Sequence, residues 1–345
     1  MVGVAGLGFE SLGSHALGAS GSGGVGMNEL VSIVVAMYNS ASFIEKTIEC
    51  LVSQTYSPVE IILVDDGSTD GTFALVEALA RSTKSIRCYR KENGGVASAR
   101  NYGIQRATGS YVAFCDHDDW WTREKLARQM PLFGADPGVG LVYSPVRAVD
   151  EQGGILKDRM PGTVYEGEVL ERLLCYNFIP FSSVVVRKAC FDLLGGFRED
   201  RLMHGSDDRN MWIRLATRFR VRCCQDVLVD IVRHGQNYSD QDAKMLEAGL
   251  RCLADIWKSV PEIRKRDERL YRRSYSEIHR LYGVTFFAKG DYGASRACML
   301  SAARAEPWRI STYPHLLLSL MPSRLVDRAR AVRRRALALG NRQAL

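Results

Sequence analysis

Three carboxylates lie within four residues in the segment 115–119, Cys-Asp-His-Asp-Asp. The apolar residues 111–114 directly precede them and predict a buried strand. Ligands of open α/β sheets bind at the carboxyl ends of the strands, so we expect Asp116 and Asp118 to face a crevice. Carboxylates about 4 Å apart repel each other, and an oxygen-only pair suits a hard cation such as Mg²⁺ or Mn²⁺. A solvated acidic turn that caps the next helix is the alternative.

Strands and helices alternate along the first third of the chain, and these acids follow the fourth strand of the series. Continuous β-branched runs are typical of strands buried on both faces, and apolar residues three and four apart are typical of helices. The alternation predicts a parallel, doubly wound sheet with its functional loops at one edge. The predicted strands are residues 31–37, 59–64, 86–89 and 111–114, and the predicted helices are 43–52, 72–81 and 96–107.

Polar loops occur at the same predicted edge after the other strands. The first strand is followed by Tyr-Asn-Ser at 38–40 and the second by Asp-Asp-Gly at 65–67. Gly94 and Gly95 come just before the third helix. Two glycines let a backbone approach a ligand closely, and the amino end of a helix favours anions, although most Gly-Gly pairs are plain turns.

The order and spacing of these motifs resemble family 2 glycosyltransferases of the GT-A fold over about residues 30–240. The matching segments are 36–39 (Ala-Met-Tyr-Asn), 65–71 (Asp-Asp-Gly-Ser-Thr-Asp-Gly), 93–95 with 99–104, and 116–119 (Asp-His-Asp-Asp). The resemblance implies a doubly wound mixed sheet, with a nucleotide-binding half and an acceptor half, followed by a helical C-terminal region. It implies an inverting, metal-dependent transfer of a hexosyl group from a nucleotide-diphosphate donor, a UDP-sugar, to an acceptor hydroxyl.

The resemblance also assigns a donor site. Tyr38 and Asp66 would hold the nucleobase with Asp65 beside them, and Arg100 would line the diphosphate pocket together with Asp116. A phenol offers a stacking face to a base, and a carboxylate accepts its N–H groups. Packing is the alternative for Tyr38, and a surface salt bridge is the alternative for Arg100.

A metal site is implied at the DxD motif, residues 116–118. Asp118 would be the direct ligand of Mn²⁺ or Mg²⁺, with Asp116 beside it, and His234 of an Arg-His pair would reach back to the metal or the diphosphate. A neutral imidazole can ligate a metal, and a metal neutralises a leaving diphosphate. A purely structural role is the alternative for His234.

The implied general base is Asp208, about 90 residues after the DxD motif. It begins a predicted helix in which Met211 and Leu215 share one face. The family usually has Glu-Asp-x-Asp here, whereas this chain has Asp207, Asp208, Arg209 and Asn210. Asp207 is therefore either a second catalytic acid or a helix cap.

Further elements are predicted beyond the acid cluster. The pair Trp120-Trp121 either stacks on sugar faces or packs in the core, and a helix follows at 122–133. A hairpin is predicted at 148–156 and a short helix at 189–194. Strands are predicted at 139–144, 182–187 and 226–232, and helices at 244–259, 267–289 and 292–305.

Charge is unevenly distributed over the 345 residues. Residues 1–240 carry 25 basic and 29 acidic side chains, or −4, so that 21 basic and 10 acidic side chains, or +11, remain for 241–345. We expect a disordered Gly/Ser-rich tail at 1–27, with Met27 a candidate start, a glycosyltransferase domain at 28–240, a helical extension at 241–320 and a basic tail at 321–345.

The basic tail predicts a membrane contact. Residues 322–339 form an amphipathic pattern with arginines outside its apolar stripe, which is typical of helices on anionic membrane surfaces. The alternative is a basic helix packed on its own domain. No aromatic platform alternates with the arginines, so we do not expect nucleic acid as a partner.

The amino-acid composition favours one cellular compartment over others. Hydrophobic residues make up 46% and charged residues 25%, values typical of globular proteins. The nine cysteines show no metal-binding spacing, which favours a reducing cytosol. We expect no secretory signal and no membrane span, and a cytoplasmic enzyme held peripherally at the inner face of the cytoplasmic membrane, acting on a lipid-linked or polysaccharide acceptor of the cell envelope.

Two other functions stay open. A sugar nucleotidyltransferase needs a Gly-rich loop after the first strand, and residues 38–42 contain no glycine. A catalytically impaired module that binds sugar nucleotide or membrane is suggested by Asp207 and Asn210. Donor hydrolysis or sugar transfer by the purified protein distinguishes a module from an enzyme.

Overall fold

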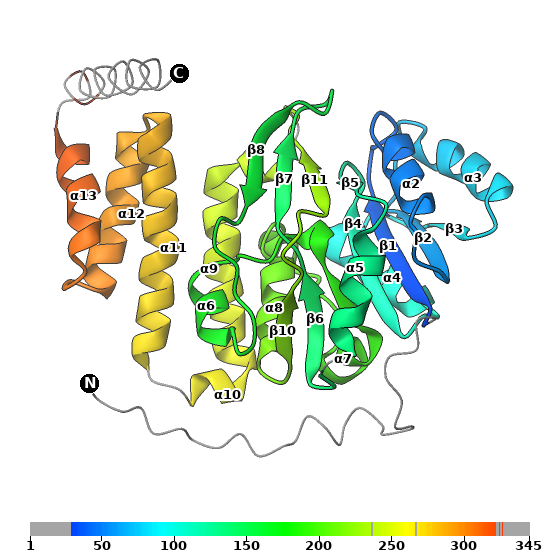
Figure 1. Cartoon of the computed structure of the whole chain (residues 1–345). Helices are drawn as coiled ribbons and strands as arrows, with labels where there is room; N and C mark the ends of the chain where they lie inside the picture. Colours follow the sequence, from blue (N-terminus) through cyan, green and yellow to red (C-terminus); the bar gives the residue numbers. More distant parts are fainter. Residues whose placement is uncertain are drawn as a thin grey trace, which may run out of the picture. The chain divides into compact units, whose positions relative to one another are not determined.

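The structure is a computed structural model that describes residues 29–134, 136–235, 237–265 and 268–321, together with 324 and 326 (Figure 1). The predicted tail at 1–27 and nearly all of the predicted basic segment at 321–345 lie outside these residues. The chain divides into two compact units at Asn237 and Tyr238, except that Leu174–Tyr176 belongs to the second unit. Within the described part of the chain, no helix is long and apolar enough to cross a membrane.

The first unit begins with the predicted parallel strands. The order in space is β3-β2-β1-β4, with all three pairs parallel. These strands are β1 (Val31–Met37), β2 (Val59–Asp65), β3 (Ile86–Arg90) and β4 (Tyr111–Asp116), and the intervening helices are α2 (Ile44–Val52), α3 (Thr72–Ser82) and α4 (Val96–Arg106). The continuous apolar runs of β1, β2 and β4 are buried on both faces of the sheet, as predicted, whereas β3 at the edge is buried only at Ile86.

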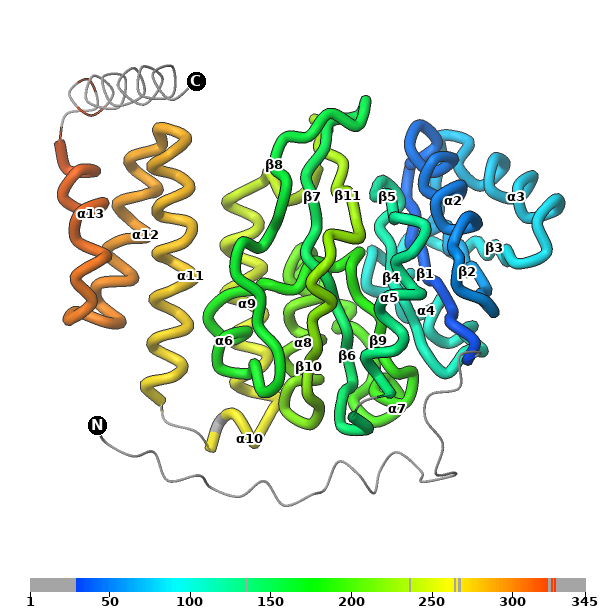
Figure 2. The backbone as a smooth tube through the Cα atoms, viewed as in Figure 1, coloured from blue at the N-terminus to red at the C-terminus, as the bar shows by residue number. Residues whose placement is uncertain are grey.

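Beyond β4 the sheet becomes mixed. Strand β9 (Val185–Arg187) runs antiparallel to both β4 and β6 (Val139–Tyr143), and β10 (Arg220–Cys223) pairs parallel with β6 at the edge. The tube in Figure 2 lets the reader follow this order. The predicted strand at 182–187 is shorter than expected, because its first residues form the 3₁₀ turn η2 (Phe181–Ser183).

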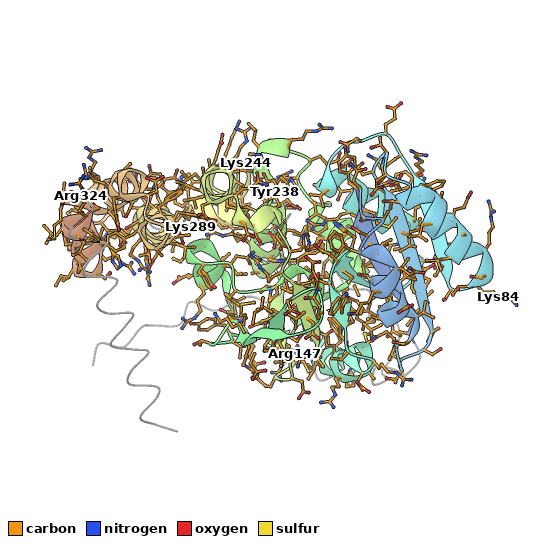
Figure 3. The ribbon with its side chains drawn as sticks, turned by 90° about the horizontal axis from the view of Figure 1, so that it is seen from above. Lys84, Arg147, Tyr238, Lys244, Lys289 and Arg324 are labelled. Atoms are coloured by element: carbon orange, nitrogen blue, oxygen red, sulfur yellow. The ribbon has the colours of Figure 1, made fainter. Side chains whose placement is uncertain are left out.

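A second, four-stranded sheet has the order β5-β11-β7-β8. Arg147 of β7, labelled in Figure 3, makes a bidentate ion pair with Asp230 of β11. Its Nε lies 2.7 Å and its Nη2 2.8 Å from the carboxylate oxygens. The strands are β5 (Trp120–Trp121), β7 (Val146–Val149), β8 (Ile155–Met160) and β11 (Val229–Val232). The predicted helix at 122–133 is divided into α5 (Lys125–Gln129) and the 3₁₀ turn η1 (Met130–Phe133).

Helices cover both faces of the larger sheet. On one face, alternate residues of β1 join a buried cluster with Ile44 and Ile48 of α2 and with Leu126 of α5. On the other face, α4 approaches β1 closely, because Gly103 lies over Val34. The same face carries an aromatic cluster in which Phe114 contacts the rings of Phe181, Phe191, Phe197 and Trp212. The remaining helices of this unit include α6 (Leu170–Cys175, which extends into the second unit), α7 (Lys188–Leu194), η3 (Arg201–Met203) and α8 (Asp207–Ala216).

The second unit is helical. Lys289, at the end of α11, bonds to Asp242 at the start of α9 with Nζ 2.6 Å from the carboxylate (Figure 3). Asp291 caps α12 by accepting a hydrogen bond from the Ala294 N–H group. The elements are η4 (Tyr238–Asp240), α9 (Asp242–Ser259), α10 (Pro261–Arg264), α11 (Glu268–Lys289), α12 (Tyr292–Ala305), η5 (Ile310–Thr312) and α13 (Tyr313–Leu320). Sequence analysis missed α10 and α13.

The contact between α4 and β1 predicts the effect of a single added methyl group. In Gly103→Ala, the Cβ atom would lie 2.4 Å from Val34 Cγ1, so we expect the free energy of unfolding to fall by about 1–3 kcal/mol. Urea unfolding followed by circular dichroism measures the change.

Two further variants test whether close packing is the cause. Gly162→Ala places a Cβ in open space and should leave the stability of the protein within about 0.5 kcal/mol of the wild type. Val34→Ala in the Gly103→Ala background should restore part of the loss. A loss of equal size in Gly162→Ala would contradict the packing argument.

Candidate active site

The loops after β1 and β2 are joined by Asn39. Its backbone N–H donates to Ser68 Oγ at 2.9 Å, and its side-chain oxygen accepts from the Thr69 N–H at 2.9 Å. Asn39 has a φ of 49°, in the left-handed region that asparagine tolerates better than most residues. The neighbouring Tyr38 stays 49% exposed, so the structure gives this phenol an open face and the core-packing alternative is wrong.

The two acids after β2 have different partners. Asp65 is fully buried and accepts from the Ser68 N–H group, with Arg90 Nε 3.3 Å from its carboxylate. The Asp66 carboxylate accepts from the N–H groups of Gly94, at 3.0 Å, and Gly95, at 2.8 Å. Sequence analysis predicted that these glycines approach an anionic ligand, and the anion in the structure is Asp66 itself.

Lys91 completes the Asp66 environment, with Nζ 2.8 Å from the carboxylate. The carboxylate therefore bonds to two backbone N–H groups at the amino end of α4 and to one ammonium group. Sequence analysis missed Lys91, because nothing in its local pattern distinguishes it from a surface lysine.

Arg100 of α4 joins two acids that are far apart in the sequence. It donates through Nη2 to Asp116, 3.0 Å away at the end of β4, and through Nη1 to Asp207, 2.5 Å away at the start of α8. Its guanidinium also lies over the Phe181 ring, 3.5 Å from the centroid, and only 7% of Arg100 is exposed. The alternative of a surface salt bridge for Arg100 is therefore wrong.

The second acid of the DxD motif contacts the predicted histidine. Asp118 Oδ2 lies 2.9 Å from His234 Nε2, and the imidazole stacks on Phe43 with ring centroids 4.4 Å apart. The Asn237 side chain also reaches His234, because its Oδ1 accepts from the His234 backbone N–H at 2.6 Å. The structure thus brings Asp118 and His234 together, across 116 residues of sequence.

Asp116 does not join this pair, because its Oδ1 is bound to Arg100. Among the residues that the structure describes, no group of three or more His, Cys, Asp or Glu side chains is placed to hold a metal ion. Asp118 supplies the oxygen donor that Mn²⁺ and Mg²⁺ prefer, and His234 adds a nitrogen donor, which suits softer divalent metals better than Mg²⁺. These two residues therefore fit a metal that is shared with a substrate.

Asp119 has a structural environment. Ser182 Oγ donates to its Oδ2 at 2.5 Å, and the Val232 N–H donates to its Oδ1 at 3.3 Å. Ser182 Oγ also accepts from the Asp116 N–H at 2.9 Å, so one hydroxyl ties both ends of the acidic turn. Burial raises the pKa of Asp119 well above its ordinary value, and the charges of Asp118 and Asp116 add to the effect.

Ser182 was missed by sequence analysis, because residues 182–187 were interpreted as one strand. Pro180, two residues earlier, was the available signal for a turn.

The predicted base lies at the start of α8. Asp208 Oδ1 accepts from the Arg209 N–H at 2.6 Å, and Oδ2 accepts from Asn177 Nδ2 at 3.1 Å. Burial raises the pKa of Asp208 from 3.8 to about 7, and the adjacent charge of Asp207 adds to the effect. Trp212, fully buried one turn further on, fixes the helix among the rings of Phe114, Phe181 and Phe197.

The two departures from the family pattern have partners inside the protein. Asp207 is the first residue of α8 and not its cap, which is Ser206, and its carboxylate bonds to Arg100. Asn210 is buried, and its Oδ1 accepts from Arg214 Nε at 2.9 Å. Both side chains therefore have hydrogen-bonding partners in this environment.

The adjacent tryptophans differ in exposure. Trp121 is buried, with Lys125 Nζ 3.7 Å from its ring centroid, so it packs in the interior. Trp120 is partly exposed, and Lys46 Nζ lies 3.0 Å from its ring centroid. Lys46 covers the ring that stacking on a sugar would require.

Comparison with known sequences identifies the family. A profile of glycosyl transferase family 2 matches residues 32–192. An uncharacterized glycosyltransferase of Rickettsia typhi is 30% identical over 223 residues, which are 63% of this chain and 68% of that protein. The chain belongs to glycosyltransferase family 2, and this membership disfavours the nucleotidyltransferase alternative. An uncharacterized glycosyltransferase of Rickettsia felis is 29% identical over 282 residues, 80% of this chain but only 45% of that protein.

Solved structures show the same fold. Residues 1–349 of TarS from S. aureus, in complex with UDP-GlcNAc, superpose with a TM-score of 0.59 at 16% identity, covering 87% of this chain and 91% of that one. The mannosyltransferase PcManGT from Pyrobaculum calidifontis, in complex with GDP-Man and Mn²⁺, gives a TM-score of 0.56 at 23% identity, covering 84% and 85%. The mixed α/β sheet of the GT-A type is therefore confirmed.

The buried position of Arg100 predicts a large cost for its removal. Arg100→Met leaves Asp116 and Asp207 without their shared cation, so we expect the free energy of unfolding at neutral pH to fall by about 3–5 kcal/mol. Urea unfolding measures it. Arg81→Met, which removes a surface pair with Glu77, should change stability by about 0.5 kcal/mol or less.

A double variant separates lost packing from unpaired charge. Asp207→Asn removes one of the two carboxylates, so Arg100→Met with Asp207→Asn should be less destabilised than the sum of the single variants. Strict additivity would show that the pair carries no coupling energy.

Proposed function

We propose that this glycosyltransferase moves a hexosyl group with inversion from a UDP-sugar to a hydroxyl of a lipid-linked or polysaccharide acceptor, with Asp208 as the general base. The observation that carries the proposal is the position of Asp208. Its neighbour Asp207 is bound to Arg100, and Arg100 is bound to the DxD residue Asp116. A proton acceptor and a phosphate-binding motif are thus held by one ion-pair network.

Tyr38, Asp65 and Asp66 form the proposed nucleobase end of the donor site. The exposed Tyr38 ring offers a stacking surface, and the two acids lie at the end of the neighbouring strand β2. Structural neighbours are complexed with UDP-GlcNAc and with GDP-Man, which supports a nucleotide-sugar donor in general. UDP in particular comes from the sequence resemblance.

Asp118 and His234 are the proposed ligands of a divalent metal, with Asp116 beside them on Arg100. When bound, Mn²⁺ or Mg²⁺ neutralises negative charge on the diphosphate. The Mn²⁺ in the PcManGT complex supports the choice of metal. Arg100 of α4, a permanently charged group bound to Asp116, is the proposed lining of the diphosphate pocket.

The transfer itself is a single displacement. The acceptor oxygen attacks the anomeric carbon, its bond to that carbon forms while the bond from the sugar to the diphosphate breaks, and the electron pair leaves on the diphosphate oxygen. The proton of the acceptor hydroxyl goes to an Asp208 carboxylate oxygen. A base with a pKa of about 7 matches this task, because it is largely ionised just above neutrality and still binds the proton well.

A catalytically impaired module that binds sugar nucleotide or membrane is the weaker alternative. It was suggested by Asp207 and Asn210, and both have hydrogen-bonding partners inside the protein. An intact base environment at Asp208 favours the enzyme.

Removal of the base should slow transfer without weakening donor binding. In Asp208→Asn we expect sugar transfer to fall by about 10²-fold or more, roughly 3 kcal/mol in the barrier. Initial rates with a UDP-sugar and donor affinity by calorimetry provide the two readouts. Transfer near the wild-type rate in Asp208→Asn, together with collapse in Asp207→Asn, would move the base one residue back.

The pH dependence of the wild-type enzyme tests the same assignment. Below its pKa Asp208 is protonated and cannot accept a proton, so kcat/KM should rise with pH and level off above an inflection near 7. Asn177 stabilises the charged form of Asp208, so Asn177→Ala should move the inflection to higher pH. An inflection near pH 4 that is the same in the wild type and in Asn177→Ala would contradict the assignment of Asp208 as the base.

Metal dependence of donor binding tests Asp118. Calorimetry of UDP-sugar binding with and without Mn²⁺ should show a metal effect in the wild type that is lost in Asp118→Asn. Asp226→Asn, which removes an equal charge from an exposed pair with Arg128, is the matched control and should retain the effect. Undiminished metal-dependent binding in Asp118→Asn would remove the DxD assignment.

A further inference from the structure

Helix α13 and the preceding turn η5 have an inverted distribution of polar and apolar side chains. Thr312 and Ser319 are fully buried, whereas Ile310 is 81% and Leu317 63% exposed. In a helix of a soluble protein, the apolar side chains normally face the core and the polar ones face water. We define the α13 apolar surface by its exposed members, which are Trp308, Ile310, Leu317, Leu318, Leu320 and Met321.

The exposed residues of α13 lie on one side of the helix. Pro314, Leu317 and Leu318 are separated by three and one positions, the spacing that places side chains on the same side of a helix, and Ile310 of η5 and Met321, the residue after α13, are exposed at its two ends. This continuity distinguishes the α13 apolar surface from the single exposed leucines that are ordinary on protein surfaces.

Hydrogen bonds and a ring contact hold the polar face of α13 toward helices α11 and α12. Arg296 of α12 donates through Nε to the Ser319 carbonyl oxygen at 3.2 Å, and the Ser319 hydroxyl donates to the Leu316 carbonyl oxygen at 2.7 Å. The His315 ring meets Phe287 of α11 at 5.5 Å between centroids. Helix α13 packs beside α12 (Figure 1). Rotating the helix to bury its leucines would break the contacts with Arg296 and Phe287.

The charge of the surrounding sequence favours an anionic partner. Residues 307–345 contain eight arginines and one acid, Asp327, which gives +7. Arg309 is held by Glu277 and Glu306, so the other seven, all between 324 and 342, carry the excess. Arg324 is the first of them (Figure 3). A second copy of this chain would bring like charges together, whereas an anionic bilayer offers opposite charge and an apolar interior.

Among the described residues that follow α13, Val326 does not cover the apolar surface. It is buried and packs against Phe287 and Tyr292, and Phe287 also contacts the His315 ring on the inward side of α13.

We infer that the α13 apolar surface inserts into the interfacial region of an anionic phospholipid membrane, which the positive charge of the following sequence favours. Apolar side chains and a basic segment together provide the two signals that stable peripheral binding requires. Sequence analysis assigned membrane contact to residues 322–339 alone, so this surface is an additional element. The inference is independent of the proposed transfer reaction.

Vesicle sedimentation tests it with the full chain. We expect binding to vesicles of phosphatidylcholine with phosphatidylglycerol, and much weaker binding to phosphatidylcholine alone. Ile310→Asn with Leu317→Asn should lower the partition coefficient by at least about tenfold. Ile155→Asn with Leu156→Asn is the matched control, because these residues of β8 are 58% and 60% exposed and should leave binding unchanged.

Further readouts separate a loss of membrane binding from a loss of folding or of activity. Circular dichroism and donor hydrolysis without vesicles should be unchanged in both double variants, so that failure of the proposed enzyme function is seen separately. Fluorescence quenching by brominated lipids should be lost in Trp308→Phe if this side chain enters the bilayer.

Three results would overturn the inference. The first is equal vesicle binding by the wild type and by the double variant that carries Ile310→Asn and Leu317→Asn. It would mean that the arginines alone bind the membrane. Another is loss of binding in the β8 control. The third is a wild-type dimer by light scattering that becomes monomeric in the α13 variant while vesicle binding persists, which would make a second copy the partner.

Discussion

A buried guanidinium holds the candidate active site together. Arg100 comes from α4, Asp116 from the end of β4 and Asp207 from the start of α8, so one side chain connects two consecutive elements to a third that is distant in sequence. A charge in a low-dielectric interior is tolerated only with partners of opposite sign in good geometry. The acidic turn and the helix that carries Asp208 are therefore positioned by the same interaction, and neither can shift without exposing an unpaired charge.

Aspartates of identical chemistry have different tasks around this ion pair because their neighbours differ. Asp119 is buried, accepts hydrogen bonds from Ser182 and from a backbone N–H group, and stabilises the acidic turn. Asp118, one residue earlier, stays next to His234 at the site. Asp208 is partly exposed and has an elevated pKa, which suits proton transfer. The environment of each aspartate, more than its residue type, distinguishes a structural role from a proposed chemical role.

Local patterns predicted the first half of the fold well. β1 has the predicted bounds because a continuous β-branched run has no competing structure, and the alternation of strands with helices required parallel pairing. The edge strand β10 was missed because Arg-Val-Arg-Cys is short and half polar. α13 was missed because its burial pattern is inverted, so an analysis that assumes apolar residues face inward does not find it.

The site was predicted less completely, because its decisive contacts are long-range. The motifs located Arg100, Asp116, Asp118, Asp208 and His234, but no local pattern shows that Arg100 meets Asp207, 107 residues away. Asn177 and Ser182 lie in a segment with no motif of its own, and their contacts with Asp208 and Asp119 arise only from tertiary packing.

The Asp66 carboxylate at the amino end of α4 has a consequence for selectivity. Because Asp66 and the N–H groups of Gly94 and Gly95 belong to one folded chain, their association is intramolecular and has a high effective concentration. Inorganic phosphate and other ambient anions compete poorly for those two N–H groups, so the positive end of this helix is unavailable to them. Under the proposed assignment, a nucleobase bound at Asp66 would act on the helix that carries Arg100, which is the group proposed for the diphosphate.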